Sequence, residues 1–126
     1  MNKIFLKKSR EKSLLKRHPW IYSGAIARVE GNCANGETVE IYSADNRYLA
    51  CGAISPASQL AFRVWSFVEI VVIDQDFFDK RLREAESLRR TMQIPQRTSA
   101  WRLCASEADG LPGVTVDVYN DFASVQ

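Results

Sequence analysis

Histidine and cysteine are scarce in this sequence, and their scarcity excludes several kinds of site. The 126 residues contain one histidine, His18, and three cysteines that lie far apart, Cys33, Cys51 and Cys104. Structural zinc sites need paired Cys and His residues at short spacing, so we expect no metal site. An odd number of cysteines also argues against a disulfide framework. Free thiols in a reducing compartment are the simplest interpretation, and we predict a cytoplasmic protein.

The sequence also lacks the elements of a self-contained catalytic site. His18 is followed by Pro19 and has no evident serine or cysteine nucleophile as a partner. A dinucleotide or S-adenosylmethionine fold needs a strand, a glycine-rich turn and a helix in quick succession. The glycine-containing segment 109–113 is followed by a strand pattern instead, so it is interpreted as a rigid turn. We therefore predict no catalytic residue and no cofactor in this chain.

Long hydrophobic runs are absent as well. The most apolar stretch, residues 64–73, is interrupted by Ser66 and Glu69 and is too short to span a bilayer. The basic opening is not followed by a long apolar run, so it does not have the pattern of a signal peptide. With 46% hydrophobic and 25% charged residues, the composition predicts a soluble globular protein with no membrane partner.

Positive charge is concentrated at the N-terminal end. Residues 1–17 carry an excess of six positive charges, and Glu11 is their only acid, whereas the whole chain has a net charge of only +2. This asymmetry favours a polyanionic partner, although a solvated basic helix without a binding role remains open. The candidate RNA-binding cations of this segment are Lys7, Lys8, Arg10, Lys12, Lys16 and Arg17.

Aromatic rings follow the basic segment directly. His18, Trp20 and Tyr22 are of the types that stack on unpaired bases. For Trp20 a place in the hydrophobic core is the favoured interpretation, and for His18 a helix C-cap and an RNA contact are equally open. Arg63 lies on an otherwise apolar strand and points either to the same face or to solvent. His18 and Arg63 complete the set of candidate RNA-binding residues.

The first part of the chain has the pattern of a small β barrel. Ser9 is expected to cap a helix that continues to about Arg17, and Pro19 cannot extend it. Asn35-Gly36 and Asp45-Asn46 favour tight turns between strands. The expected strands are residues 4–6, 20–22, 26–29, 38–42, 48–54 and 60–67. Short strands at this spacing are typical of a small barrel.

The sequence pattern changes from short strands to a long helical periodicity near residue 70, where we place a domain boundary. A strand at 70–73 is expected, followed by a helix that Asp74 or Asp76 opens and Pro95 ends. Further strands are expected at 101–105, 114–118 and 122–126. The apolar face of the helix is predicted to contain Phe78, Leu82, Ala85, Leu88 and Met92.

The predicted fold class is therefore α+β, with a mostly-β barrel over residues 1–70 and a strand-helix-strand-strand unit over 71–126. The second unit ends within a strand, so we expect it to be part of a larger domain. Its open edge near Val125 leaves a homodimer as a possibility.

Three blocks of the sequence, in order, resemble the ribosomal RNA large subunit methyltransferase I family. The first runs from residue 8 to residue 25 and includes Arg17-His18-Pro19-Trp20-Ile21-Tyr22. The second is Ser55-Pro56-Ala57-Ser58-Gln59 followed by Arg63-Val64-Trp65. The third is residues 106–113 with Val116-Asp117. The resemblance extends across essentially the whole chain.

This resemblance implies a PUA barrel, an RNA-recognition module, over residues 1–70, and a linking α+β domain from residue 71. Members of the family form 5-methylcytosine in 23S ribosomal RNA. Their S-adenosylmethionine site and catalytic cysteine belong to a Rossmann-like domain that follows these two. Cys33, Cys51 and Cys104 match no catalytic motif of the family, so no such role is transferred to them. The expected function is that of the RNA-binding N-terminal portion, with ribosomal RNA as the partner and S-adenosylmethionine required only by the parent protein.

Two alternatives remain open at this point. The chain could be a protein-interaction module whose basic helix meets an acidic protein surface without any role in RNA binding. It could also be a self-sufficient enzyme, which binding of S-adenosylmethionine by this chain alone would demonstrate.

Overall fold

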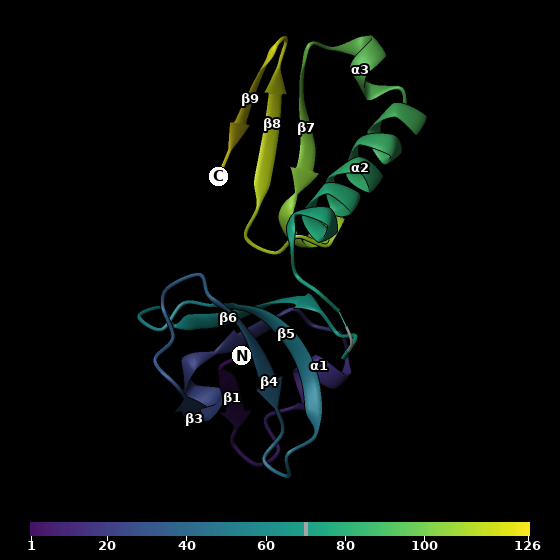
Figure 1. The fold of residues 1–126 in the computed structure, drawn as a ribbon. Helices are drawn as coiled ribbons and strands as arrows, with labels where there is room; N and C mark the ends of the chain where they lie inside the picture. The colour runs from purple at the N-terminus through teal and green to yellow at the C-terminus, as the bar shows by residue number, and fades with distance from the viewer. Residues whose placement is uncertain (70) are drawn as a thin grey trace. The chain divides into compact units, whose positions relative to one another are not determined.

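The computed structural model describes residues 1–69 and 71–126, which divide into two compact units (Figure 1). The first unit is Met1–Val71 and the second is Val72–Gln126. No helix in the described part of the chain is both long and apolar enough to cross a membrane. The mixture of a curled sheet with few helices confirms the predicted α+β class.

The first unit is a curled six-stranded sheet in the order β2-β6-β5-β4-β1-β3. β1 is parallel to β4, and the other neighbouring pairs are antiparallel. Its strands are β1 (Lys3–Leu6), β2 (Trp20–Tyr22), β3 (Ile26–Glu30), β4 (Thr38–Tyr42), β5 (Tyr48–Ile54) and β6 (Leu60–Ser66). Two short helices, α1 (Lys12–Leu15) and η1 (Ser23–Ala25), complete the unit. The six predicted strands are confirmed, each within one residue of its expected bounds.

Alternation along the strands builds the core of this unit. In β4, Val39 and Ile41 are fully buried, while the residues between and beside them are partly exposed. Burying a large apolar side chain stabilises a fold by about 1.5–3 kcal/mol, so this alternation fixes which face turns inward. In β2 the buried residue is Ile21, with 2% of its surface exposed. The expectation that Trp20 belongs to the core is wrong, because Trp20 lies on the other face of the strand and is only half-buried.

The second unit packs two helices against a three-stranded antiparallel sheet in the order β7-β8-β9. Its elements are α2 (Gln75–Thr91), α3 (Ile94–Arg97), β7 (Ala100–Ala105), η2 (Ser106–Asp109), β8 (Thr115–Tyr119) and β9 (Phe122–Val125). Asp74 caps α2, because its carboxylate accepts a hydrogen bond of 3.0 Å from the Phe77 backbone N–H. The bounds of β7, β8 and β9 confirm the three predicted C-terminal strands, each within one residue.

Three expectations for this unit are corrected. Val71–Ile73 has no strand structure, and the remaining residue of the predicted strand, Ile70, lies outside the described residues. Pro95 does not end α2, which stops at Thr91. It lies in the first turn of α3, where backbone N–H groups have no partner within the helix, so proline's missing N–H breaks no hydrogen bond. On the predicted apolar face of α2, Ala85 is buried, but Leu88 and Met92 are half-exposed.

Two arginines of α2 hold the segment that follows β7. The Arg89 guanidinium pairs with both carboxylate oxygens of Asp109, and Arg81 donates a hydrogen bond to the Gly110 carbonyl. Asp109 also accepts a bond of 2.7 Å from the Ala105 backbone N–H. Gly110 adopts a positive φ of 72°, which glycine tolerates without strain. Residues 109–113 thus belong to a turn before β8 and are not followed by a helix, as predicted.

Candidate nucleic-acid interface

The basic segment after β1 is mostly non-helical, and the predicted helix from Ser9 to Arg17 is wrong in extent. Only Lys12–Leu15 is helical, and its N-cap is Glu11, without a side-chain capping bond. Ser9 and Arg17 have positive φ values of 67° and 63°, which end any helix at those positions. Lys8 therefore lies outside the helix, and Lys8, Lys12 and Lys16 do not form one helical row.

One leucine attaches this segment to the barrel. Leu14 is 2% exposed and belongs to the core of the first unit, whereas the adjacent Leu15 is 58% exposed. The His18 backbone N–H donates to the Ser13 carbonyl at 2.9 Å and closes the end of the short helix. These contacts fix the backbone of the segment, so its long cationic side chains extend from an anchored main chain.

The six predicted cations of this segment are all exposed, and we call them the basic surface. They are Lys7, Lys8, Arg10, Lys12, Lys16 and Arg17. Within the described residues, none of them takes part in an ion pair. Arg17 stacks over the Phe67 ring at 4.8 Å. The one acid of the segment, Glu11, has a buried carboxylate oxygen, so the charge turned toward solvent is positive.

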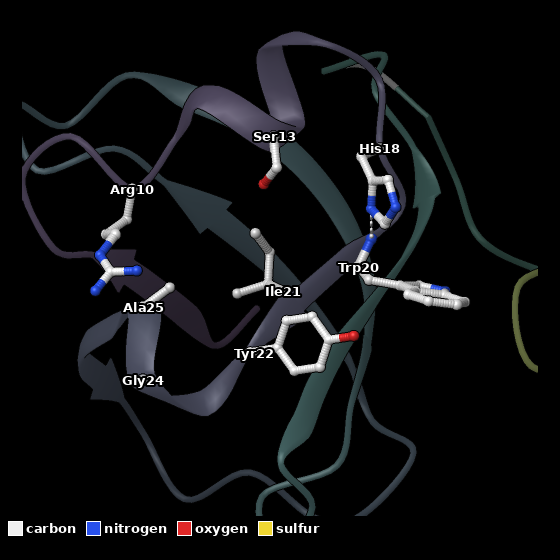
Figure 2. Close-up of a pocket in the computed structure, with 8 residues that line it drawn as sticks. All are labelled: Arg10, Ser13, His18, Trp20, Ile21, Tyr22, Gly24 and Ala25. Carbon is white, nitrogen blue, oxygen red and sulfur yellow. Dashed lines mark hydrogen bonds between the residues drawn. The ribbon is translucent and has the colours of Figure 1, made fainter.

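A pocket of about 310 Å³ lies between the basic segment and the start of β2 (Figure 2). It is lined by Arg10, Ser13, His18, Trp20, Ile21, Tyr22, Gly24 and Ala25. Figure 2 shows Arg10 and His18 on opposite sides of this pocket, with the Ser13 hydroxyl and the Tyr22 ring between them. The Tyr22 side chain is 55% exposed. A cation, hydroxyl and imidazole groups and an aromatic ring therefore converge in one place.

The orientation of His18 is set by its neighbour Trp20. The Trp20 backbone N–H donates to Nδ1 of His18 at 3.3 Å, and the two rings meet edge to face with centroids 5.4 Å apart. A neutral imidazole that accepts at Nδ1 carries its proton on Nε2, which leaves Nε2–H as a donor. The C-cap of α1 is Lys16, so His18 is not the C-cap residue, and only its backbone N–H takes part in closing the end of the helix.

Arg63 lies next to the pocket rather than in it. It is directly opposite Trp20 in the β2–β6 pair, while the adjacent Ile21 is opposite Phe62 on the core side. Directly opposed residues of an antiparallel pair share a face, so Arg63 and Trp20 extend the same outer surface. The predicted residues thus separate into Arg10 and His18 in the pocket, Arg63 beside Trp20, and the other cations around α1. Ser13 was not predicted as a site residue, because a four-residue helix gives no periodic signal for which side chain turns inward.

The cysteines have the surroundings of structural residues. Cys51 and Cys104 are buried, as predicted, and burial raises the pKa of both thiols. A raised pKa keeps a thiol protonated at neutral pH and therefore unreactive. No cluster of three or more His, Cys, Asp or Glu side chains is arranged to hold a metal ion within the described ranges 1–69 and 71–126.

Comparison with known proteins agrees with this architecture. Residues 4–67 match the model of the PUA-like domain family. Ribosomal RNA large subunit methyltransferase I from Aeromonas salmonicida is 53% identical over 123 residues, which are 98% of this chain and 31% of that protein. The enzyme of the same name from Serratia proteamaculans is 45% identical over 124 residues, again 98% and 31% of the two chains. The chain thus spans about a third of the length of these curated relatives and resembles their N-terminal region.

Solved structures share the fold. A protein described as a SAM-dependent methyltransferase from Streptococcus mutans superimposes with a TM-score of 0.79 at 21% identity, covering 99% of this chain and 32% of that one. A methyltransferase structure with bound SAH gives a TM-score of 0.80, also at 21% identity and with the same coverage. The arrangement of elements in both units therefore recurs in known proteins.

Proposed function

The chain belongs to the PUA-like domain family, and we propose that it binds ribosomal RNA as the N-terminal part of a methyltransferase. The observation that carries this proposal is the basic surface: six exposed cations, without ion pairs among the described residues, one of which, Arg10, lines a pocket that contains aromatic and hydrogen-bonding groups. Unpaired cations next to stacking rings are the combination that single-stranded RNA requires.

The cations supply affinity by contacting phosphates. Lysine and arginine side chains that neutralise phosphates release condensed counterions, and this release favours binding at low salt. Phosphate contacts position an RNA without reading its sequence. Lys12 is the first residue of α1 and Lys16 is its C-cap, so both belong to the anchored turn that also contains Ser13, a residue of the pocket lining.

The pocket accepts one unpaired nucleotide in this proposal. The exposed ring of Tyr22 offers a stacking surface, the Arg10 guanidinium offers donors for a phosphate, and Nε2–H of His18 and the Ser13 hydroxyl offer further hydrogen bonds. Arg63 and Trp20 continue this surface along β6 and β2.

The relatives support a more specific assignment. Their shared name, ribosomal RNA large subunit methyltransferase I, supports ribosomal RNA as the partner of this domain. The proposed reaction of the whole protein is 5-methylcytosine formation in 23S ribosomal RNA, in the cytoplasm. This chain corresponds to only 31% of the relatives' length, so S-adenosylmethionine binding and catalysis are assigned to the rest of the protein.

Charge reversal tests the proposal. The variant Lys12→Glu, Lys16→Glu, Arg17→Glu should bind a structured ribosomal RNA fragment at least about tenfold more weakly at low salt, because three phosphate contacts become repulsive. The matched control Lys80→Glu, Arg83→Glu, Arg97→Glu makes the same change of charge at exposed positions of the second unit and should stay within about twofold of wild type. Circular dichroism checks that both variants fold.

Equal RNA affinity of the two variants would overturn the proposal. A protein-interaction module predicts a different result: an acidic polypeptide binds wild-type protein and RNA does not compete with it. Competition between RNA and the polypeptide for the same cations supports the RNA assignment when RNA binds more tightly.

A further inference from the structure

The two faces of the β7–β8–β9 sheet differ in chemistry. The helix-facing side is apolar, and a groove of about 380 Å³ beside α2 is lined by several aliphatic residues, including Leu82, Leu103 and Val116. The opposite side, which we call the outer face, contains two cross-strand rows. The first row is Ala100, Tyr119 and Phe122, and the second is Arg102, Asp117 and Ser124. The bulge between Arg102 and Cys104 brings Arg102 to the outer face while Cys104 stays buried.

Exposed aromatic rings are concentrated at one end of the outer face. Tyr119 and Phe122 are directly opposite each other across the turn that joins β8 and β9. Tyr119 is 51% and Phe122 78% exposed, so both rings are accessible to a ligand. In some RNA-recognition modules, a sheet presents aromatic rings to solvent and RNA bases stack on them.

A hollow of about 410 Å³ lies beside Tyr119. It is lined by Ala100, Trp101, Arg102, Asp117 and Tyr119, and its volume is within the range of about 300–1,000 Å³ that small ligands occupy. The Arg102 guanidinium and the Asp117 carboxylate pair through bonds of 2.8 Å and 3.1 Å. These bonds engage Nε and Nη2, so within the described parts of the chain the Nη1 donors of Arg102 stay available beside a fixed carboxylate.

We propose that this hollow binds an unpaired nucleobase of RNA, stacked on Tyr119 with its edge toward Arg102 and Asp117. The proposal extends the RNA-binding function to the second unit and rests on that function for the nature of its ligand. A nucleobase has a flat π face and an edge with donors and acceptors, and the hollow offers a complement to each.

Other occupants fit the hollow less well. A phosphate needs a net positive charge, but Arg102 and Asp117 together are neutral. An apolar helix needs a continuous aliphatic surface, and that chemistry is found on the helix-facing side instead. The proposed contact is therefore base-dependent, in contrast to the backbone contacts of the basic surface.

The experiment is an NMR titration of the whole 126-residue chain with two probes. One probe is a short unpaired RNA, and the other is an abasic oligomer with the same number of phosphates. The RNA should shift the signals of Arg102, Asp117 and Tyr119 as well as those of the basic surface. The abasic oligomer should shift only the basic surface, because it has no base to stack.

Ring substitutions then test the stacking itself. Tyr119→Ala should weaken the RNA affinity measured from the Arg102 and Asp117 shifts by about 5- to 150-fold, the range of one base–aromatic stack, whereas Tyr119→Phe keeps the ring and should stay near wild type. Met92→Ala removes a side chain of similar exposure at the C-cap of α2 and serves as the control.

The outcomes separate this inference from the proposed function. Shifts at the basic surface alone overturn the nucleobase site and leave the proposed function standing. Shifts at the hollow alone support the nucleobase site and contradict the role of the basic surface. An abasic oligomer that shifts the hollow as strongly as the RNA does overturns the base-dependent contact, as does full binding by Tyr119→Ala.

Discussion

The Arg89 guanidinium and the Asp109 carboxylate form two parallel hydrogen bonds, one of them 2.7 Å long, between residues 20 positions apart. Arg89 is 12% and Asp109 4% exposed, so this ion pair is largely shielded from water. Arg89 also donates to the Arg102 carbonyl of β7 at 3.1 Å. One side chain of α2 thereby connects the helix, the first strand of the sheet and the turn after it.

Removing Arg89 should strongly destabilise the second unit. Arg89→Met leaves the Asp109 carboxylate buried without its partner, and loss of one member of a buried pair typically costs about 3–5 kcal/mol. The measurement is the free energy of unfolding in urea. The neighbouring Arg90→Met is the control, because the Arg90–Glu86 pair is half-exposed and such pairs contribute about 0–1 kcal/mol. Similar losses in the two variants would contradict the structural role of the buried pair.

The same pair should make stability depend on pH. Arg89 holds the pKa of Asp109 below its ordinary value, so the ionised carboxylate is favoured in the folded state. This contribution is fully present above the unfolded pKa of about 4 and is lost as the pH falls through the lower folded pKa. The difference in unfolding free energy between wild type and Asp109→Asn should therefore be largest near neutral pH and shrink below about pH 4. A difference that stays constant from neutral to acidic pH would rule this linkage out.

A glycine of β5 is required by close packing between strands. A Cβ added at Gly52 would lie 2.0 Å from the Arg63 carbonyl oxygen. This oxygen belongs to the backbone, so it cannot move away as the end of a flexible side chain could. Gly52→Ala should cost about 1–3 kcal/mol in unfolding free energy and displace β6 around Arg63. Gly24→Ala, where a Cβ meets nothing within 4 Å, should change stability by less than about 0.5 kcal/mol. Thermal and urea unfolding of both variants decide this, and a neutral Gly52→Ala is the contrary result.

The strands of the first unit were predictable because local signals agree with the final packing. Thr38–Tyr42 and Tyr48–Ile54 alternate or are continuously apolar, and the turn between them contains Asn46 with a positive φ of 65°. The extent of α1 was not predictable. Ser9 is a good helix cap in general, but here it adopts a left-handed turn conformation after β1. The anchoring of Asp109 by Arg89 joins distant residues, so no spacing rule for a single helix predicts it.

For the candidate site, the sequence supplies the charges but not the pocket. The exposed cations follow from composition, because lysine and arginine without nearby acids remain in solvent. The convergence of Arg10, Ser13, His18 and Tyr22 depends on Leu14 anchoring the segment and on the path of the chain into β2. That path is a tertiary property, and periodicity in a segment this short does not encode it.

Tyr22 provides a test of the pocket that is independent of charge. Tyr22→Ala should weaken binding of unpaired RNA by about 1–3 kcal/mol, because a stacking surface is lost, while Tyr22→Phe should bind nearly as wild type does. The side chain is 55% exposed, so neither change should unfold the barrel. Affinities measured by fluorescence anisotropy on folded variants check this. Equal losses for alanine and phenylalanine would assign the effect to the hydroxyl instead of the ring.

The most direct test of the central claim is the salt dependence of RNA binding by this chain. We expect the logarithm of the association constant to fall linearly with the logarithm of salt concentration, with a slope of magnitude about 2 or more for three or more phosphate contacts on unpaired RNA. The Lys12→Glu, Lys16→Glu, Arg17→Glu variant should lose about 2 from that slope. A slope near zero, or one that the variant leaves unchanged, would contradict the assignment of the basic surface as the site of RNA binding.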